Sequence, residues 1–185
     1  MNILAPIRYE PDFLKMNADT AFERVRDEPA WVRHGTTPRM EYFVSRVGKA
    51  YSYGVKEFAR TYEPQPSTHG IDVIWKMVEM YVGVNFDVCF LNRYLNQSDH
   101  LGWHSDNSPE MDDARPIAVV SLGVAREIMF RSIDPDEGYE KLLLAHGSLL
   151  VMSPGMQDTH QHRIPKSNRQ CGERISLTFR GYVEP

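Results

Sequence analysis

The chain has no long apolar run and very little cysteine, and both shortages narrow the possible classes of protein. No apolar stretch in its 185 residues approaches the length of about 18 residues that a membrane-spanning helix requires. The N-terminus lacks a basic region followed by an apolar run, so we expect no signal peptide. Cys89 and Cys171 form no C-x-x-C pair, and we expect free thiols in a reducing compartment. These features favour a cytoplasmic protein, or a nuclear one if the host is a eukaryote.

An excess of positive charge is also missing. The formal net charge is −4 and the sequence pI is about 6.0, which gives no general electrostatic footprint for nucleic acid. The 21 lysines and arginines still permit a local basic groove. The apolar fraction of 42% and the charged fraction of 25% are ordinary for a globular protein of this length. We therefore expect a single domain over residues 1–185.

Helical periodicity is confined to the first half of the chain. Residues 71–82 place apolar side chains on one helical face before Gly83, and residues 19–27 predict a shorter helix. Strands are expected at 31–37 and within 41–53. Further short strands, separated by turn residues, are expected at 88–94, 117–122, 127–131, 141–145, 148–152 and 175–180. The pattern predicts a mainly β core, a sandwich or a barrel, with flanking N-terminal helices.

The sequence W-H-S-D at 103–106 places a histidine and an aspartate two positions apart. On an extended strand, His104 and Asp106 share one face and lie about 6.6 Å apart along it. A second imidazole, for which His162 is a candidate, would complete three ligands on one face of an octahedron, as in non-heme Fe(II) oxygenases. The H-x-D pattern alone is common by chance, and a zinc hydrolase would use the same residue types.

The last predicted strand alternates between polar and apolar residues. Its polar face comprises Arg174, Ser176, Thr178 and Arg180. Two inward guanidiniums need anionic partners because unpaired buried charge is costly, and a dicarboxylate meets this need by bidentate pairing. Asn92 and Tyr94, two apart on an earlier strand, could hydrogen-bond the same dicarboxylate. The alternatives are a solvated edge strand with surface arginines, and a buried Asn–Tyr pair without a ligand.

Four motifs occur together in a specific order: N-R-Y at 92–94, W-H-S-D at 103–106, Q-H-R-I-P at 161–165 and R-I-S-L-T-F-R at 174–180. With these motifs the chain resembles the AlkB family of Fe(II)- and 2-oxoglutarate-dependent dioxygenases, from about Thr37 to Arg180. The resemblance implies a double-stranded β-helix, or jelly roll, over residues 86–181. It implies a substrate-recognition lid and a helix over residues 35–85. It also implies Fe(II), the co-substrate 2-oxoglutarate, and O₂.

The resemblance implies an iron site made of His104, Asp106 and His162. His160 competes with His162 for the third position, and the sequence H-R-I-P, 12 positions before Arg174, favours His162.

The resemblance also implies a co-substrate site. Arg174 would pair with the distal carboxylate of 2-oxoglutarate, helped by Tyr94. Asn92 and Arg180 would hold the rest, with Arg180 near the end that chelates iron. The family often has asparagine where this chain has Ser176, so we expect a weaker contact at that position.

Candidate substrate contacts lie further upstream and just after the H-x-D. Tyr51 and Tyr53 resemble the aromatic lid strand that could stack a flipped base, although an ordinary amphipathic strand has the same pattern. Arg39 could contact phosphate, with a solvated surface as the default. The family's repair enzymes carry carboxylates after the H-x-D, where this chain has Asn107 and Ser108, which disfavours a cationic methylated base.

From these observations we expect a monomeric oxidative demethylase of alkylated bases in single- or double-stranded DNA or RNA, acting in DNA repair. The alternative is an AlkB-like hydroxylase acting on an unalkylated base, a protein or a small molecule. A non-catalytic binding domain is a third interpretation. It is disfavoured because the sequence retains every candidate metal ligand and both arginines.

Overall fold

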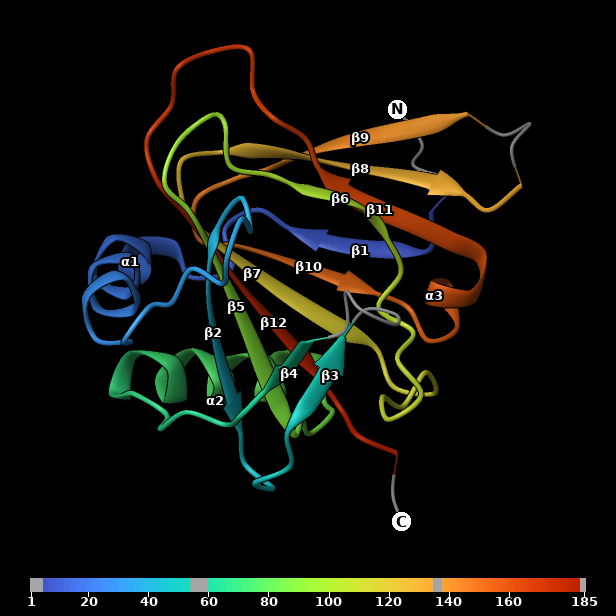
Figure 1. The fold of residues 1–185 in the computed structure, drawn as a ribbon, viewed down its shortest axis with the longest axis horizontal. Coiled ribbons are helices and arrows are strands. Elements are labelled where there is room, and N and C mark those ends of the chain that lie inside the picture. Colours follow the sequence, from blue (N-terminus) through green and yellow to red (C-terminus); the bar gives the residue numbers. More distant parts are fainter. Residues whose placement is uncertain (1–4, 54–59, 135–137, 184–185) are drawn as a thin grey trace.

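The computed structural model describes residues 5–53, 60–134 and 138–183, and within these ranges it has two large antiparallel sheets, with the two longest helices on one side (Figure 1). The larger, six-stranded sheet has the order β1 (Ile7–Glu10), β10 (Ser148–Met152), β7 (Ile117–Gly123), β12 (Arg174–Arg180), β5 (Val88–Tyr94) and β2 (Met40–Ser45). The four-stranded sheet has the order β6 (Leu101–His104), β11 (His160–Ile164), β8 (Arg126–Ser132) and β9 (Tyr139–Leu144). A separate hairpin pairs β3 (Tyr51–Tyr53) with β4 (Arg60–Tyr62).

The two longest helices lie in the first half of the chain. They are α1 (Ala18–Asp27), which follows the short η1 (Lys15–Asn17), and α2 (His69–Val82); the one-turn helix α3 (Met156–Thr159) lies late in the chain, just before β11. Helix α2 ends at Gly83, whose φ of 77° lies in the left-handed region that glycine adopts without strain. In the described part of the chain, no helix combines the length and the apolar character that crossing a bilayer would need.

The expected jelly roll with N-terminal helices is confirmed, and so are both helices and all six later strands to within two residues at each end. The strand expected at 31–37 is wrong, because this segment forms only an isolated bridge between Val32 and Glu41. The segment expected as strand at 41–53 contains β3 and all of β2 except Met40, but β2 pairs with β5 and β3 with β4, so they form no hairpin with each other. The expected lid segment also includes residues 54–59, which lie outside the described residues.

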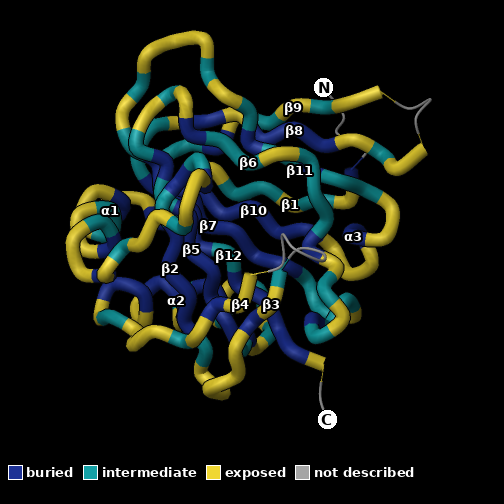
Figure 2. Tube along the Cα trace, in the orientation of Figure 1, coloured by how far each residue is buried: buried dark blue, intermediate teal, exposed yellow. Residues whose placement is uncertain are grey.

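The two faces of β12 serve different layers of the molecule. Its apolar face packs beneath α2, where the rings of Trp75 and Phe179 lie 5.3 Å apart. Figure 2 shows that β5, β7 and β12 are buried along most of their length. The opposite face of β12 points to the space between the two sheets, which is where the predicted site residues gather.

Candidate active site

A cavity between the two sheets brings together nearly all of the residues predicted for the site. The larger sheet contributes polar and aromatic side chains from β12 and β5, and the smaller sheet closes the cavity with β6, β8 and β11. The described residues that line it are Arg39, Tyr51, Tyr53, Tyr62, Phe90, Asn92, Tyr94, Leu101, His104, Asp106, Val119, Ile128, His162, Ile164, Arg174, Ser176, Thr178 and Arg180. Ser108 stands outside this set, but its hydroxyl lies 3.0 Å from that of Tyr51.

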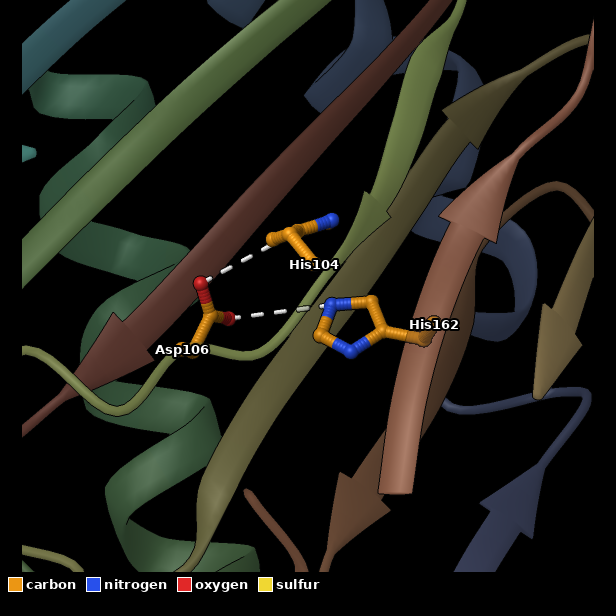
Figure 3. A group of neighbouring side chains, drawn as sticks. All are labelled: His104, Asp106 and His162. Atoms are coloured by element: carbon orange, nitrogen blue, oxygen red, sulfur yellow. Dashed lines mark ion pairs between the residues drawn. The ribbon is translucent and has the colours of Figure 1, made fainter. Parts of the chain in front are cut away.

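Strands β6 and β11, and the loop that follows β6, position a candidate metal centre. His104 ends β6 and lies opposite His162 of β11 in the antiparallel register, and Asp106 follows two residues after β6 ends. The Nε2 atoms of His104 and His162 each lie 3.8 Å from an oxygen of Asp106 (Figure 3). All three ligand atoms fall within 4.8 Å of one another, so a single cation between them can be reached by all three.

The protonation states of these residues suit a divalent cation. Burial, together with the neighbouring His104, lowers the pKa of His162 to about 3, and burial also lowers the pKa of His104. Both imidazoles are therefore neutral near pH 7. His104 Nδ1 lies 2.9 Å from the carbonyl oxygen of Gly102, an arrangement that leaves the Nε2 lone pair free for a ligand bond.

Asp106 supplies the negative charge of the centre. Burial alone would raise its pKa, but electrostatic interactions, first with the charge of Arg180 and then with His104 and His162, lower the pKa to about 2. The backbone N–H of Asp106 donates to Gln157 Oε1 at 2.9 Å and so fixes the loop that carries it. Two neutral imidazoles and one carboxylate on one side of a cavity form the donor set of non-heme Fe(II) sites.

His160, the competing histidine, is not part of this group. Its Nδ1 lies 2.8 Å from Thr159 Oγ1, and it pairs with Ser132 at the start of β11.

Arg174 is buried without a full set of partners. Its Nη2 donates to Ser121 Oγ at 2.9 Å, but Nε and Nη1 make no hydrogen bond with the described protein. Its guanidinium carbon lies 5.3 Å from the ring centroid of Tyr94, and burial lowers its pKa. Strand β12 lies between β7 and β5, so the alternative of a solvated edge strand is wrong. A buried guanidinium with two unsatisfied nitrogens fits an anionic ligand, since such groups are costly when left unpaired.

Arg180 lies at the metal end of the cavity. Its Nη1 is 3.5 Å from Asp106 Oδ1 and 3.3 Å from the Tyr51 hydroxyl, which accepts a hydrogen bond from it. Burial lowers the pKa of Arg180, but the charge of Asp106 and the interactions with Tyr51 and Tyr182 together outweigh burial and raise it. Because its Nε is also buried without a partner, Arg180 retains a donor for a ligand beside the metal residues.

Asn92 and Arg39 form a polar wall next to this position. Asn92 faces Ser176 across the β5–β12 pair, and its Oδ1 accepts a hydrogen bond from Arg39 Nε at 2.6 Å. The default expectation of a solvated surface for Arg39 is wrong. Arg39 is only 9% exposed, because it immediately precedes β2, which joins the larger sheet beside β5.

Two residues next to the cavity were not foreseen. Glu41 is 1% exposed, and its two oxygens accept hydrogen bonds from Arg39 Nη2 at 2.6 Å and from the Tyr62 hydroxyl at 3.1 Å. The only signal in the sequence is a carboxylate within the apolar run of β2. Its partner Tyr62 comes from β4, and no local pattern brings β4 to β2.

Aromatic rings close the cavity above the metal residues. Tyr51 and Tyr62 stack with centroids 6.2 Å apart and 21° between their planes, and Tyr62 meets Phe90 edge-on at 4.8 Å. Tyr53 lies 6.4 Å from His104, edge to face. Burial raises the pKa values of Tyr53 and Tyr62 to about 12, so both phenols stay neutral. The hairpin thus offers flat, uncharged surfaces within reach of the metal centre.

The sequence matches the 2OG-Fe(II) oxygenase superfamily over residues 7–180. It is 33% identical to the alpha-ketoglutarate-dependent dioxygenase alkB homolog 3 of Bos taurus, over 95% of this chain and 66% of that protein. It is 32% identical to the DNA oxidative demethylase ALKBH2 of Mus musculus, over 78% of this chain and 62% of that protein. The chain therefore spans just under two thirds of the length of these relatives.

The fold agrees with these matches. The solved structure of OsALKBH1 superposes with a TM-score of 0.65 at 18% sequence identity, covering 97% of this chain and all of that one. The resemblance to the AlkB family inferred from the four motifs is confirmed by the matching relatives. The chain belongs to the 2OG-Fe(II) oxygenase superfamily.

Proposed function

We propose that the protein is an Fe(II)- and 2-oxoglutarate-dependent dioxygenase that oxidatively demethylates alkylated nucleobases in DNA or RNA. The observation that carries this proposal is the convergence of His104, Asp106 and His162 within 4.8 Å, in the same cavity as a buried arginine with unsatisfied donors. A zinc hydrolase would account for the three ligands but not for Arg174.

His104, Asp106 and His162 would hold the iron, and the neutral imidazoles and ionised carboxylate described above need no proton loss to do so. Arg174 would pair through its free Nε and Nη1 with the distal carboxylate of 2-oxoglutarate, against the ring of Tyr94. When bound, iron and 2-oxoglutarate supply the O₂-dependent hydroxylation of a substrate C–H bond. A hydroxylated N-methyl group is unstable and leaves the base as formaldehyde.

The remaining polar residues would orient the co-substrate. Arg39 holds the carbonyl oxygen of Asn92, so the amide N–H groups of Asn92 are free to donate into the cavity. Ser176 offers a hydroxyl beside it, and Arg180 would stabilise negative charge at the metal end. Apolar walls from Leu101, Val119 and Ile128 would exclude water from the carbon chain of 2-oxoglutarate.

The substrate base would enter beside the β3–β4 hairpin. Stacking surfaces from Tyr51, Tyr53 and Tyr62 near His104 support a flat aromatic ligand, and Ser108 holds the Tyr51 hydroxyl. We assign the lid role to residues 35–85 and the catalytic core to residues 86–181 of a single domain. The relatives named as an alkB homolog and a DNA oxidative demethylase support a nucleic-acid substrate.

The test is product formation with a methylated oligonucleotide. The purified protein with Fe(II) and 2-oxoglutarate should release formaldehyde and succinate in equal amounts, and the unmethylated oligonucleotide should yield far less formaldehyde. The His104→Ala variant, which lacks one of the three ligands, should lose this activity. Formaldehyde release no higher than with the unmethylated control would reject the proposed demethylation.

One observation favours the alternative, an AlkB-like hydroxylase with a neutral or unalkylated substrate. Among the described residues at the cavity, the acidic groups are Asp106, which we assign to iron, and Glu41, whose oxygens are both engaged by Arg39 and Tyr62. A cationic methylated base would therefore find no free carboxylate in this part of the chain. Succinate release across a panel of cationic, neutral and unmodified bases distinguishes the two candidates.

A further inference from the structure

The outer face of the smaller sheet carries a tryptophan with two arginine guanidiniums close to its ring. Trp103 lies on β6, Arg131 on β8 and Arg163 on β11. The guanidinium carbons of Arg131 and Arg163 lie 4.5 and 4.6 Å from the ring centroid of Trp103. We call these three side chains the Arg–Trp–Arg stack. They line a surface groove that is separate from the cavity between the sheets.

The charges of Arg131 and Arg163 are not paired with a carboxylate among the described residues. Arg131 donates from Nε and Nη2 to Gln161 Oε1, at 3.0 and 2.6 Å, and Arg163 Nε lies 3.3 Å from Met129 Sδ. In the parts of the chain that the structure describes, neither arginine forms a salt bridge. Asp134 lies along the same groove and offsets only part of the charge. Two guanidiniums gathered on one ring attract an anion to this surface.

The stack lies directly behind the metal centre. Trp103 precedes His104 and Arg163 follows His162, and neighbouring residues on a strand point to opposite faces of the sheet. Strand β6 is an edge of the smaller sheet, so a ligand that enters the cavity beside β6 can continue over this edge onto the outer face.

We infer that the Arg–Trp–Arg stack binds the nucleic-acid strand that delivers the base, outside the catalytic cavity. The arginines would contact phosphates, for which the planar guanidinium is well matched, and the indole would stack a base or sugar flanking the target. Tyr139, 59% exposed on the same groove, extends the aromatic surface. This inference rests on the proposed nucleic-acid substrate and explains how a chain with a net charge of −4 would hold a polyanion.

The test measures binding of a fluorescein-labelled, unmodified single-stranded oligonucleotide by anisotropy across a salt series. Arg131→Gln should weaken binding several-fold and lower the slope of log affinity against log salt by about 0.7. Trp103→Leu should weaken binding about fivefold or more by removing the stacking platform, and Trp103→Phe should recover much of this loss.

The matched control is Arg8→Gln. Arg8 is also an exposed arginine stacked on an aromatic ring, at 5.0 Å from the centroid of Tyr81, but it lies on β1 of the larger sheet. The Arg8→Gln variant should bind the oligonucleotide with the affinity and salt slope of the unmodified protein. Melting temperatures of all variants establish that they are folded.

Arg131→Gln binding with unchanged affinity and salt slope would overturn the inference, as would an equal loss in Arg8→Gln. Because the oligonucleotide is unmodified, the result does not depend on turnover. If Arg131→Gln weakens binding but the unmodified protein shows no demethylation, the binding surface is supported and the proposed reaction is rejected. If the unmodified protein demethylates but binding does not depend on Arg131 and Trp103, the reaction is supported and the binding surface is rejected.

Discussion

Arg174 illustrates how a single buried residue indicates its ligand. Arg174 is 1% exposed, yet only its Nη2 has a hydrogen-bond partner, Ser121, in the described protein. A protein rarely buries a charge and leaves its donors unused, because each unsatisfied buried group costs about 1–3 kcal/mol. In the proposed function the side chain would gain its partners when 2-oxoglutarate binds, and co-substrate binding would then be linked to the stability of the fold.

Arg174→Met should separate these two effects. Methionine fills similar space without a charge, so the ligand-free protein should keep its melting temperature or gain a little. Stabilisation by added 2-oxoglutarate, which follows from binding to the folded state, should be lost. Thermal shift with and without 2-oxoglutarate measures both quantities, and a ligand-induced shift equal to that of the unmodified protein would contradict the assignment.

Burial of His162 makes the stability of the metal-free protein depend on pH. The pKa of His162 is about 3 in the folded protein against about 6.5 in the unfolded chain. Below pH 6.5 the unfolded chain therefore binds a proton that the folded state does not. The free energy of unfolding should fall by about 1.4 kcal/mol per pH unit for this histidine as the pH drops from 6.5 toward 3.

Urea unfolding of the metal-free protein between pH 7 and pH 4.5 measures this loss. His162→Gln removes the titrating group and should show a shallower decline over the same range. Identical pH dependence in the two proteins would show that His162 is not held neutral by burial.

At the scale of elements, the β3–β4 hairpin is attached to the larger sheet by a hydrogen bond to a buried carboxylate. Glu41 on β2 accepts hydrogen bonds from Arg39 and from Tyr62 on β4. One carboxylate therefore joins the polar wall formed by Arg39 and Asn92 to the aromatic hairpin. Tyr51 of the hairpin also accepts a hydrogen bond from Arg180 at the metal end.

Glu41→Ala should therefore be more disruptive than Tyr62→Phe. The alanine leaves Arg39 buried without its partner, which costs about 3–5 kcal/mol of unfolding free energy. The phenylalanine removes one hydrogen bond but keeps the ring, so it should cost about 1 kcal/mol and preserve stacking. Chemical denaturation compares the two, and a smaller loss for Glu41→Ala would refute the role of Glu41 as an anchor.

Elements also show what the sequence could and could not predict. Strands β5, β7, β10 and β12 were predictable because each is a run of five to seven residues with a clear apolar or alternating pattern. Strands β1 and β6 have four residues each, too few to establish a period, and they exist because longer neighbours supply their hydrogen bonds. The separation of β2 from β3 depends on pairing with distant partners, which no local pattern reveals.

At the scale of the whole molecule, the same distinction applies to the site. The residues placed in the cavity by motif, such as His104 and Arg180, lie on strands whose alternation fixes their direction. Glu41 and the Arg–Trp–Arg stack depend on side chains from two or more elements meeting, and their sequence neighbourhoods look ordinary.

Strand β12 is used on both sides, with arginines toward the cavity and Ile175, Leu177 and Phe179 beneath the helices. Adding or removing one residue near its start would rotate every later side chain to the other side. A deletion would place the guanidinium of Arg180 where Phe179 meets Trp75, and an insertion would place Phe179 where Arg180 lies beside Asp106. Folding and chemistry would fail together, so changes in chain length can be accepted in the connecting loops but not within this strand.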